Sequence, residues 1–229
     1  MESLIFVGGI QYSGKSYFAR SLEASYPSRY KHIELDGLLE HLTQRREVFL
    51  GLIKRYDRDL YRQIEYAGRQ LGIKGDYDLL TLFANYMIQE GRFSEFENIQ
   101  QLYVLLYASV KIRGSKKGII PIIDGAFTNN GSRSIVYQTL RAAFGERIPL
   151  DKLQKLFVYF NLGLDLSLER FKQSRREEKK SLRWSEDLVR RTYRGQEIPE
   201  PSELSNLEVI VINNLEELER ITERLSRNA

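Results

Sequence analysis

The sequence predicts an α/β protein, with a five-stranded parallel sheet covered by helices on both faces. Two observations carry this prediction: five short apolar runs are spread along the 229 residues, and helix-like sequence follows each of them. Repeated alternation of short apolar runs with helical sequence is typical of a parallel sheet covered by helices on both faces. A hydrophobic content of 42% and a charged content of 29% fit a globular chain, which we expect to form a single domain over residues 1–229.

The predicted elements follow one another in a regular order. The first strand, residues 4–7, runs into Gly8 and Gly9, and helical sequence begins at Lys15. Further strands are expected at residues 32–35, 119–123, 156–160 and 209–212, followed at the end by an amphipathic helix at 215–225. Over about residues 38–113, between the second and third strands, apolar residues recur with helical spacing, which predicts a helical insertion.

Composition and hydropathy exclude several classes of protein. No apolar stretch approaches the ~20 residues that span a bilayer, and the first apolar run is too short for a signal peptide, so we expect a soluble cytoplasmic protein without membrane contact. The chain has no cysteine, and its two histidines are His32 and His41. Disulfides, thiol nucleophiles, thiolate metal sites and histidine-rich metal clusters are therefore excluded.

Positive charge is concentrated in one segment, residues 170–194. This segment holds ten Lys or Arg and four Asp or Glu, a net charge of +6, whereas the whole chain carries +4. Such a cluster attracts phosphate groups or polyanions, but a solvated helix face has the same composition. The other motifs of the chain decide between these two interpretations.

A motif directly after the first strand fits G-x-x-x-x-G-K-S at every fixed position. Its residues are Gly9, Ile10, Gln11, Tyr12, Ser13, Gly14, Lys15 and Ser16. The glycines let the backbone turn tightly, so that N–H groups at the start of a helix can surround phosphate oxygens. We expect this P-loop, together with Tyr17, to bind the polyphosphate of a nucleotide. Lys15 would reach the terminal phosphates, and the Ser16 hydroxyl would be a ligand for Mg²⁺.

The third apolar run ends in Asp124, where a carboxylate is placed to act as a second magnesium ligand. In ATPases that drive movement the next residue is usually a glutamate that prepares water for attack, but here Gly125 follows. The chain also lacks N-K-x-D and D-x-x-G, the patterns expected of a GTPase. Transfer of a phosphoryl group to a hydroxyl is therefore favoured over hydrolysis or a nucleotide switch.

Transfer to a hydroxyl commonly requires a carboxylate that orients the acceptor and takes its proton. Asp36 is the best candidate, because it follows the second predicted strand and the carboxyl ends of parallel strands share one edge with the P-loop. An alternative role for Asp36 is to cap the helix that follows it.

Four parts of the chain together resemble one group of P-loop kinases, which includes polynucleotide 5′-kinase, the kinase of seryl-tRNA for selenocysteine and the zeta toxins. These parts are the P-loop, Asp36, the stretch 122–129 with Arg133 beyond it, and the segment 168–193. The resemblance implies ATP and Mg²⁺ as cofactors, Asp36 as general base, and an arginine-rich lid over about residues 165–200. By position, the catalytic lid arginines would be among Arg170, Arg175 and Arg176.

The sequence thus predicts an ATP-dependent kinase that transfers the γ-phosphoryl group of Mg·ATP to a hydroxyl. The acceptor stays open between a nucleic-acid end, a tRNA-borne group, a nucleoside and a small metabolite. An alternative is an ATP-regulated protein that binds nucleic acid or protein with little phosphotransfer, which the interleaved Arg and Tyr of residues 55–66 would suit. A hydrolase or motor subunit is a third interpretation.

Overall fold

A computed structural model describes residues 3–35, 58–59, 62, 66, 112, 118–144, 149–178 and 186–227 of the chain. The chain divides into two compact units, one formed by Met1–Leu35 with Ala108–Ala229 and the other by Asp36–Tyr107. In the second unit the described residues are helical, namely Arg58, Asp59, Arg62 and Tyr66. The other positions of the predicted insertion helices lie outside the described residues, except Ile112, which is also helical. A single domain over 1–229 stays a prediction.

The first unit is built on a parallel sheet, as the sequence predicts. Its strands, in chain order, are β1 (Ser3–Gly9), β2 (Tyr30–Glu34), β3 (Ile120–Asp124), β4 (Gln154–Phe160) and β5 (Leu207–Ile212). They lie side by side in the order β2-β3-β1-β4-β5, and every neighbouring pair is parallel. Because all strands run the same way, their carboxyl ends meet along one edge of the sheet, where ligands of open α/β sheets bind.

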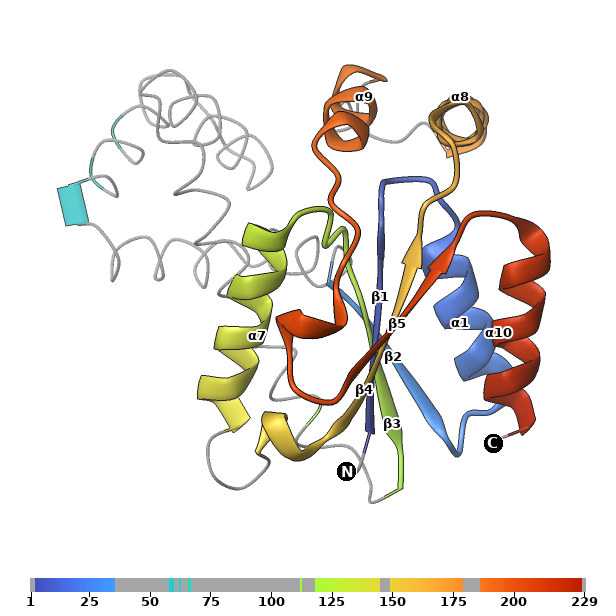
Figure 1. Cartoon of the computed structure of the whole chain (residues 1–229). Helices are drawn as coiled ribbons and strands as arrows, with labels where there is room; N and C mark the ends of the chain where they lie inside the picture. The colour runs from blue at the N-terminus through green and yellow to red at the C-terminus, as the bar shows by residue number, and fades with distance from the viewer. Residues whose placement is uncertain are drawn as a thin grey trace. The chain divides into compact units, whose positions relative to one another are not determined.

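Helices cover both faces of this sheet (Figure 1). On one face α1 (Lys15–Ser25) and α10 (Leu215–Arg227) bury Phe18, Leu22 and Ile221 against alternate residues of β1, β3 and β4. On the other face lies α7 (Asn130–Phe144), whose Tyr137 meets Phe6 of β1 edge-on with ring centroids 5.5 Å apart. The fold class predicted from the apolar runs is confirmed.

The segment between β4 and β5 forms two helices and a return to the sheet. Helix α8 (Leu164–Glu178) follows β4, and α9 (Glu186–Arg194) follows α8. A short 3₁₀ turn, η3 (Pro201–Glu203), then precedes β5, and another, η2 (Leu150–Lys152), precedes β4. Helices α8 and α9 share a small buried cluster of Leu168, Phe171 and Val189, which is separate from the sheet core.

No helix in the described part of the chain combines the length and the apolar character that crossing a membrane requires.

Candidate functional site

The P-loop connects β1 to α1 through backbone conformations that favour glycine. Gly9 has φ +134° and Gly14 has φ +100°. A Cβ on Gly9 would lie 2.5 Å from the Phe160 carbonyl oxygen, a contact that side chains cannot make, so the loop needs glycine there for space as well as for conformation. Tyr12 also has a positive φ, 62°, which is uncommon for a residue with a bulky side chain.

The loop delivers polar groups to the start of α1. Among the described residues no side chain caps this helix at Gly14, and the first backbone N–H groups of such a helix can bind an anion. Lys15 is 5% exposed, and its Nζ donates a hydrogen bond to the Ile10 carbonyl oxygen at 3.3 Å. Ser13 is fully buried, and its hydroxyl has no hydrogen-bond partner among the described residues. Buried polar groups left this way favour a polar ligand.

Asp124 ends β3, the strand beside β1, and lies next to the P-loop strand. The sheet register pairs Val7 with Asp124, and the Gly125 N–H donates to the Val7 carbonyl oxygen at 3.1 Å. The Asp124 side chain is 1% exposed. Its Oδ1 has no hydrogen-bond partner in the described part of the chain. The structure therefore places a buried carboxylate oxygen one strand away from the phosphate loop.

Three further polar residues, which the sequence did not single out, lie on the same side of the sheet. His32 of β2 has its Nε2 3.1 Å from Asp124 Oδ2. Glu34, the register partner of Asp124, accepts a hydrogen bond from Arg20 of α1 at 2.6 Å. This hydrogen bond from Arg20 raises the pKa of its guanidinium, and the Asp124 carboxylate adds to the rise. A signal for two of these residues exists in the sequence: His32 and Glu34 are polar residues two apart, so they share one face of the strand, where buried polar groups need partners.

The basic segment reaches the P-loop through Arg170 of α8. Its Nη1 donates to the carbonyl oxygens of Ser13 at 2.8 Å and Tyr12 at 3.3 Å. The Tyr12 ring meets Phe171 edge-on with centroids 5.2 Å apart, and packs against the cluster shared by α8 and α9. Side chains from segments 157 positions apart or more thus meet at the loop, and the lid over residues 165–200 stays a prediction.

The structure gives less information on Asp36, Arg175 and Arg176, and it shows that the Tyr17 side chain is exposed. Asp36 lies outside the described residues; what the structure shows is that β2 ends at Glu34 on the edge that holds the P-loop. The helical backbone of α8 includes Arg175 and Arg176, but their side chains lie outside the described part. Tyr17 has a side chain that is 79% exposed, so any contribution to phosphate binding falls to its backbone N–H.

Arg133 belongs to a structural joint rather than to the loop. Its guanidinium is 1% exposed and forms two hydrogen bonds with the Glu203 carboxylate, at 2.6 and 2.7 Å. Its Nη1 also donates to the carbonyl oxygens of Phe127, at 3.2 Å, and Glu197, at 2.7 Å. The joint ties the stretch after Asp124 to the chain that returns from α9 to the sheet.

The residues present fit a magnesium ion. The described residues contain no group of three or more His, Cys, Asp or Glu that could hold a metal. A nucleotide-bound Mg²⁺ needs no such group, because it keeps several waters and takes one or two protein oxygens beside the phosphates. Asp124 Oδ1 is a buried oxygen without a described partner, and Ser16 supplies a hydroxyl from the first turn of α1.

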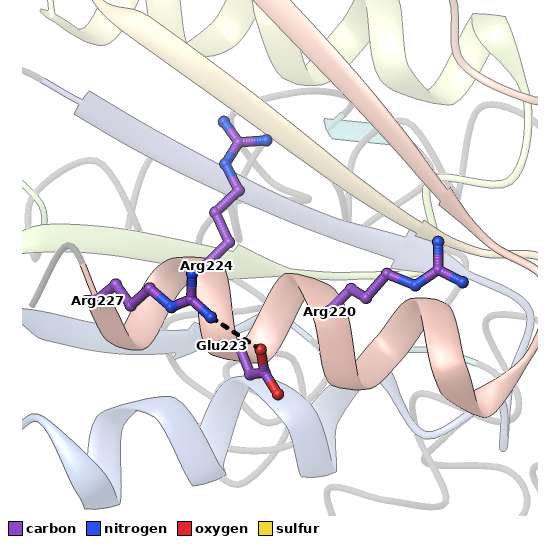
Figure 2. A pocket seen from close by; sticks show the side chains of 4 residues that line it. All are labelled: Arg220, Glu223, Arg224 and Arg227. Carbon is purple, nitrogen blue, oxygen red and sulfur yellow. Dashed lines mark hydrogen bonds and ion pairs between the residues drawn. The ribbon is translucent and has the colours of Figure 1, made fainter.

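A shallow hollow lies on the surface of α10. It has a volume of about 220 Å³ and is lined by Arg220, Glu223, Arg224 and Arg227 of α10 (Figure 2). Each of the three arginines forms an ion pair with a carboxylate, namely with Glu216, Glu208 and Glu223 in that order. Each arginine of this hollow is thus paired with a carboxylate, as is typical of a solvated helix surface.

Comparisons with known proteins bear on the fold. No family model matches the chain, and no curated protein matches its sequence. A structure described as "a putative kinase" from Chloroflexus aurantiacus J-10-fl matches with a TM-score of 0.53 and 14% identity, over 99% of this chain and 95% of that one. TT1252 from Thermus thermophilus matches with a TM-score of 0.54 and 16% identity, over 99% and 97%. These matches show that the chain shares its α/β fold, a parallel sheet covered by helices on both faces, with those two structures.

Proposed function

We propose that this protein is an ATP-dependent kinase, which transfers the γ-phosphoryl group of Mg·ATP to a hydroxyl of an acceptor. The observation that carries the proposal is the pairing of Val7 with Asp124, which sets a buried carboxylate beside a P-loop contacted by an arginine from α8. One protein with the same fold is described as "a putative kinase", which agrees with this proposal. Membership of the polynucleotide-kinase, seryl-tRNA-kinase and zeta-toxin group is the finer part of the proposal.

The surroundings of Gly125 favour transfer over hydrolysis. A Cβ at this position would lie 2.9 Å from the Phe127 ring and 3.1 Å from Leu35. A glutamate directly after Asp124, as in motor ATPases, would therefore crowd the side chains of Phe127 and Leu35. A hydroxyl acceptor brings its own nucleophile, so a site without this glutamate suits a kinase.

Each residue has a defined role in the proposed reaction. The P-loop N–H groups and Lys15 bind the phosphates, and Arg170 brings a guanidinium to the transferring group. Ser16 and Asp124 would hold the magnesium ion, which offsets phosphate charge when bound. Asp36 accepts the proton of the acceptor hydroxyl while the hydroxyl oxygen forms its bond to the γ-phosphorus. The bond between the γ-phosphorus and the bridging oxygen breaks, and that oxygen leaves with its electron pair on ADP.

A screen with γ-labelled ATP tests the proposal across acceptors of different classes. The acceptors are oligonucleotides with 5′-hydroxyls, tRNA, nucleosides and sugars, each with wild type and with Asp36→Asn. We expect label transfer to one class, and a loss of about 10²–10⁴-fold in Asp36→Asn, because a positioned base contributes about that much. ATP affinity, measured by calorimetry, should change less than about threefold, since Asp36 contacts the acceptor.

Three results would contradict the proposal. Transfer at a near wild-type rate by Asp36→Asn would remove Asp36 from the role of base. ATP turnover that needs no acceptor would favour a hydrolase, whereas tight ATP binding with neither transfer nor turnover would favour the ATP-regulated binding protein.

A further inference from the structure

The two oxygens of the Asp124 carboxylate have different surroundings. Oδ2 is 3.1 Å from His32 Nε2, whereas Oδ1 is buried and has no hydrogen-bond partner among the described residues. An ionised carboxylate can only accept hydrogen bonds, so Nε2 carries the hydrogen and donates it. The carboxylate is thus hydrogen-bonded at one oxygen and has no described partner at the other.

The register of the sheet explains how His32 reaches Asp124. On the neighbouring strand His32 pairs with Ile122, so Asp124 is two positions further along and points to the same face. Ile122 belongs to the core under α1, and the imidazole is 6% exposed. The ring therefore lies diagonally between two strands, where packing restricts its rotation.

The ionic groups next to this contact, Glu34 and Arg20, form a hydrogen-bonded pair with each other. Glu34 is the carboxylate opposite Asp124 in the register, and it is held by Arg20 at 2.6 Å. The guanidinium therefore neutralises Glu34, and the described hydrogen bond of His32 goes to Asp124. One histidine and one arginine each hold one carboxylate at the end of the β2–β3 pair.

We propose that His32 is a positioning residue, which holds Asp124 Oδ2 and so directs Oδ1 toward the magnesium ion of a bound nucleotide. The inference rests on the proposed function, since it presumes that Asp124 serves that ion. Residues that orient a metal ligand typically contribute about 10–100-fold to metal affinity or activity. A histidine that only fills the core would affect stability and leave the magnesium dependence of nucleotide binding unchanged.

Two variants that differ by one methylene group test this role. In His32→Gln the side-chain N–H₂ lies near the place of Nε2, whereas in His32→Asn it lies nearer the place of Nδ1 and falls short of Asp124. ATP affinity is measured by calorimetry, once with excess Mg²⁺ and once with EDTA. For His32→Asn we expect Mg·ATP affinity to fall about tenfold, with metal-free affinity within about twofold of wild type. His32→Gln should retain Mg·ATP affinity within about threefold.

Tyr30→Phe is the matched control. Tyr30 lies two positions before His32 on the same face of β2, and its hydroxyl donates a buried hydrogen bond to the Leu225 carbonyl oxygen at 2.9 Å. Removing this hydroxyl deletes one buried hydrogen bond at the start of the same strand, away from the P-loop. Mg²⁺ should therefore change the ATP affinity of Tyr30→Phe as much as it changes that of wild type.

The outcomes separate this inference from the proposed function. Wild-type protein that binds ATP equally with Mg²⁺ and with EDTA, or not at all, contradicts the proposed function itself. If wild type responds to Mg²⁺, then an unchanged response in His32→Asn overturns the role of His32. A lost response in His32→Gln also overturns it, and this holds even if the Asn variant does not fold.

Discussion

The P-loop region and the Arg133 joint both bury charged side chains, but they differ in how many hydrogen-bond partners the described residues give to these side chains. At the joint, Arg133 donates to a carboxylate and to two backbone carbonyl groups, so a fully buried cation is matched. Around the loop, the Ser13 hydroxyl and Asp124 Oδ1 are buried without a described partner, and Lys15 donates to one carbonyl oxygen at 3.3 Å. A matched buried charge is typical of architecture, whereas an unmatched one is typical of a place kept for a ligand.

Loss of the buried Arg133 charge at the joint should have the largest effect on stability. Arg133→Met leaves Glu203, whose side chain is 10% exposed, without its cation, and we expect the free energy of unfolding to fall by about 3–5 kcal/mol. Urea denaturation measures this change. Replacing both partners, as in Arg133→Met with Glu203→Leu, should recover a large part of the loss, because no buried charge then stays unpaired. A loss below about 1 kcal/mol in the single variant would show that the joint is not a structural element.

Loss of the Lys15 charge at the P-loop should affect nucleotide binding and not folding. In Lys15→Met we expect Mg·ATP affinity to fall by about 10–100-fold, since a hydrogen bond to a charged group contributes about 1.5–3 kcal/mol. The free energy of unfolding should change by less than about 1 kcal/mol, because the described hydrogen bond of Lys15 is a long one. Calorimetry and urea denaturation of the same preparation compare the two effects. A large loss of stability with unchanged affinity would reverse the distinction between the regions.

An exposed pair should have the smallest effect and a defined pH dependence. Two hydrogen bonds from Arg224 lower the pKa of Glu208 below its ordinary 4.5, so folding gains stability from the pair above about pH 4.5 and loses it as pH falls through the lowered pKa. Both side chains are about half exposed, which limits the contribution to about 0.2–1 kcal/mol. Urea denaturation should show Glu208→Gln less stable than wild type by that amount at pH 7 and nearly equal to it at about pH 3. A difference that grows toward low pH would contradict this sign.

Much of the fold could be predicted because the signals are local. The five apolar runs correspond to the five strands within a few residues, and the predicted start of the first helix at Lys15 is also where α1 begins. Leu35 is the first departure: it was expected in the second strand, but the strand ends at Glu34 and Leu35 is already helical. Strand ends are set by pairing with a neighbour, and β3 pairs with β2 only as far as Glu34.

The candidate site divides in the same way. The spacing of the two glycines and the lysine after the second one predicted the P-loop, because consecutive residues form a phosphate-binding turn. The contacts of His32 with Asp124, and of Arg170 with Ser13, join residues 92 and 157 positions apart. No local pattern encodes such distances. They depend on which strands become neighbours and on how α8 folds back.

By itself the sequence determined the class of fold, the phosphate-binding loop and the candidate carboxylates, since each rests on hydrophobic periodicity or on a short motif. The tertiary structure decided which polar groups are satisfied. It paired Arg133 with Glu203 and gave one oxygen of Asp124 no partner among the described residues, because the state of a buried group depends on every element packed against it, whatever its place in the chain.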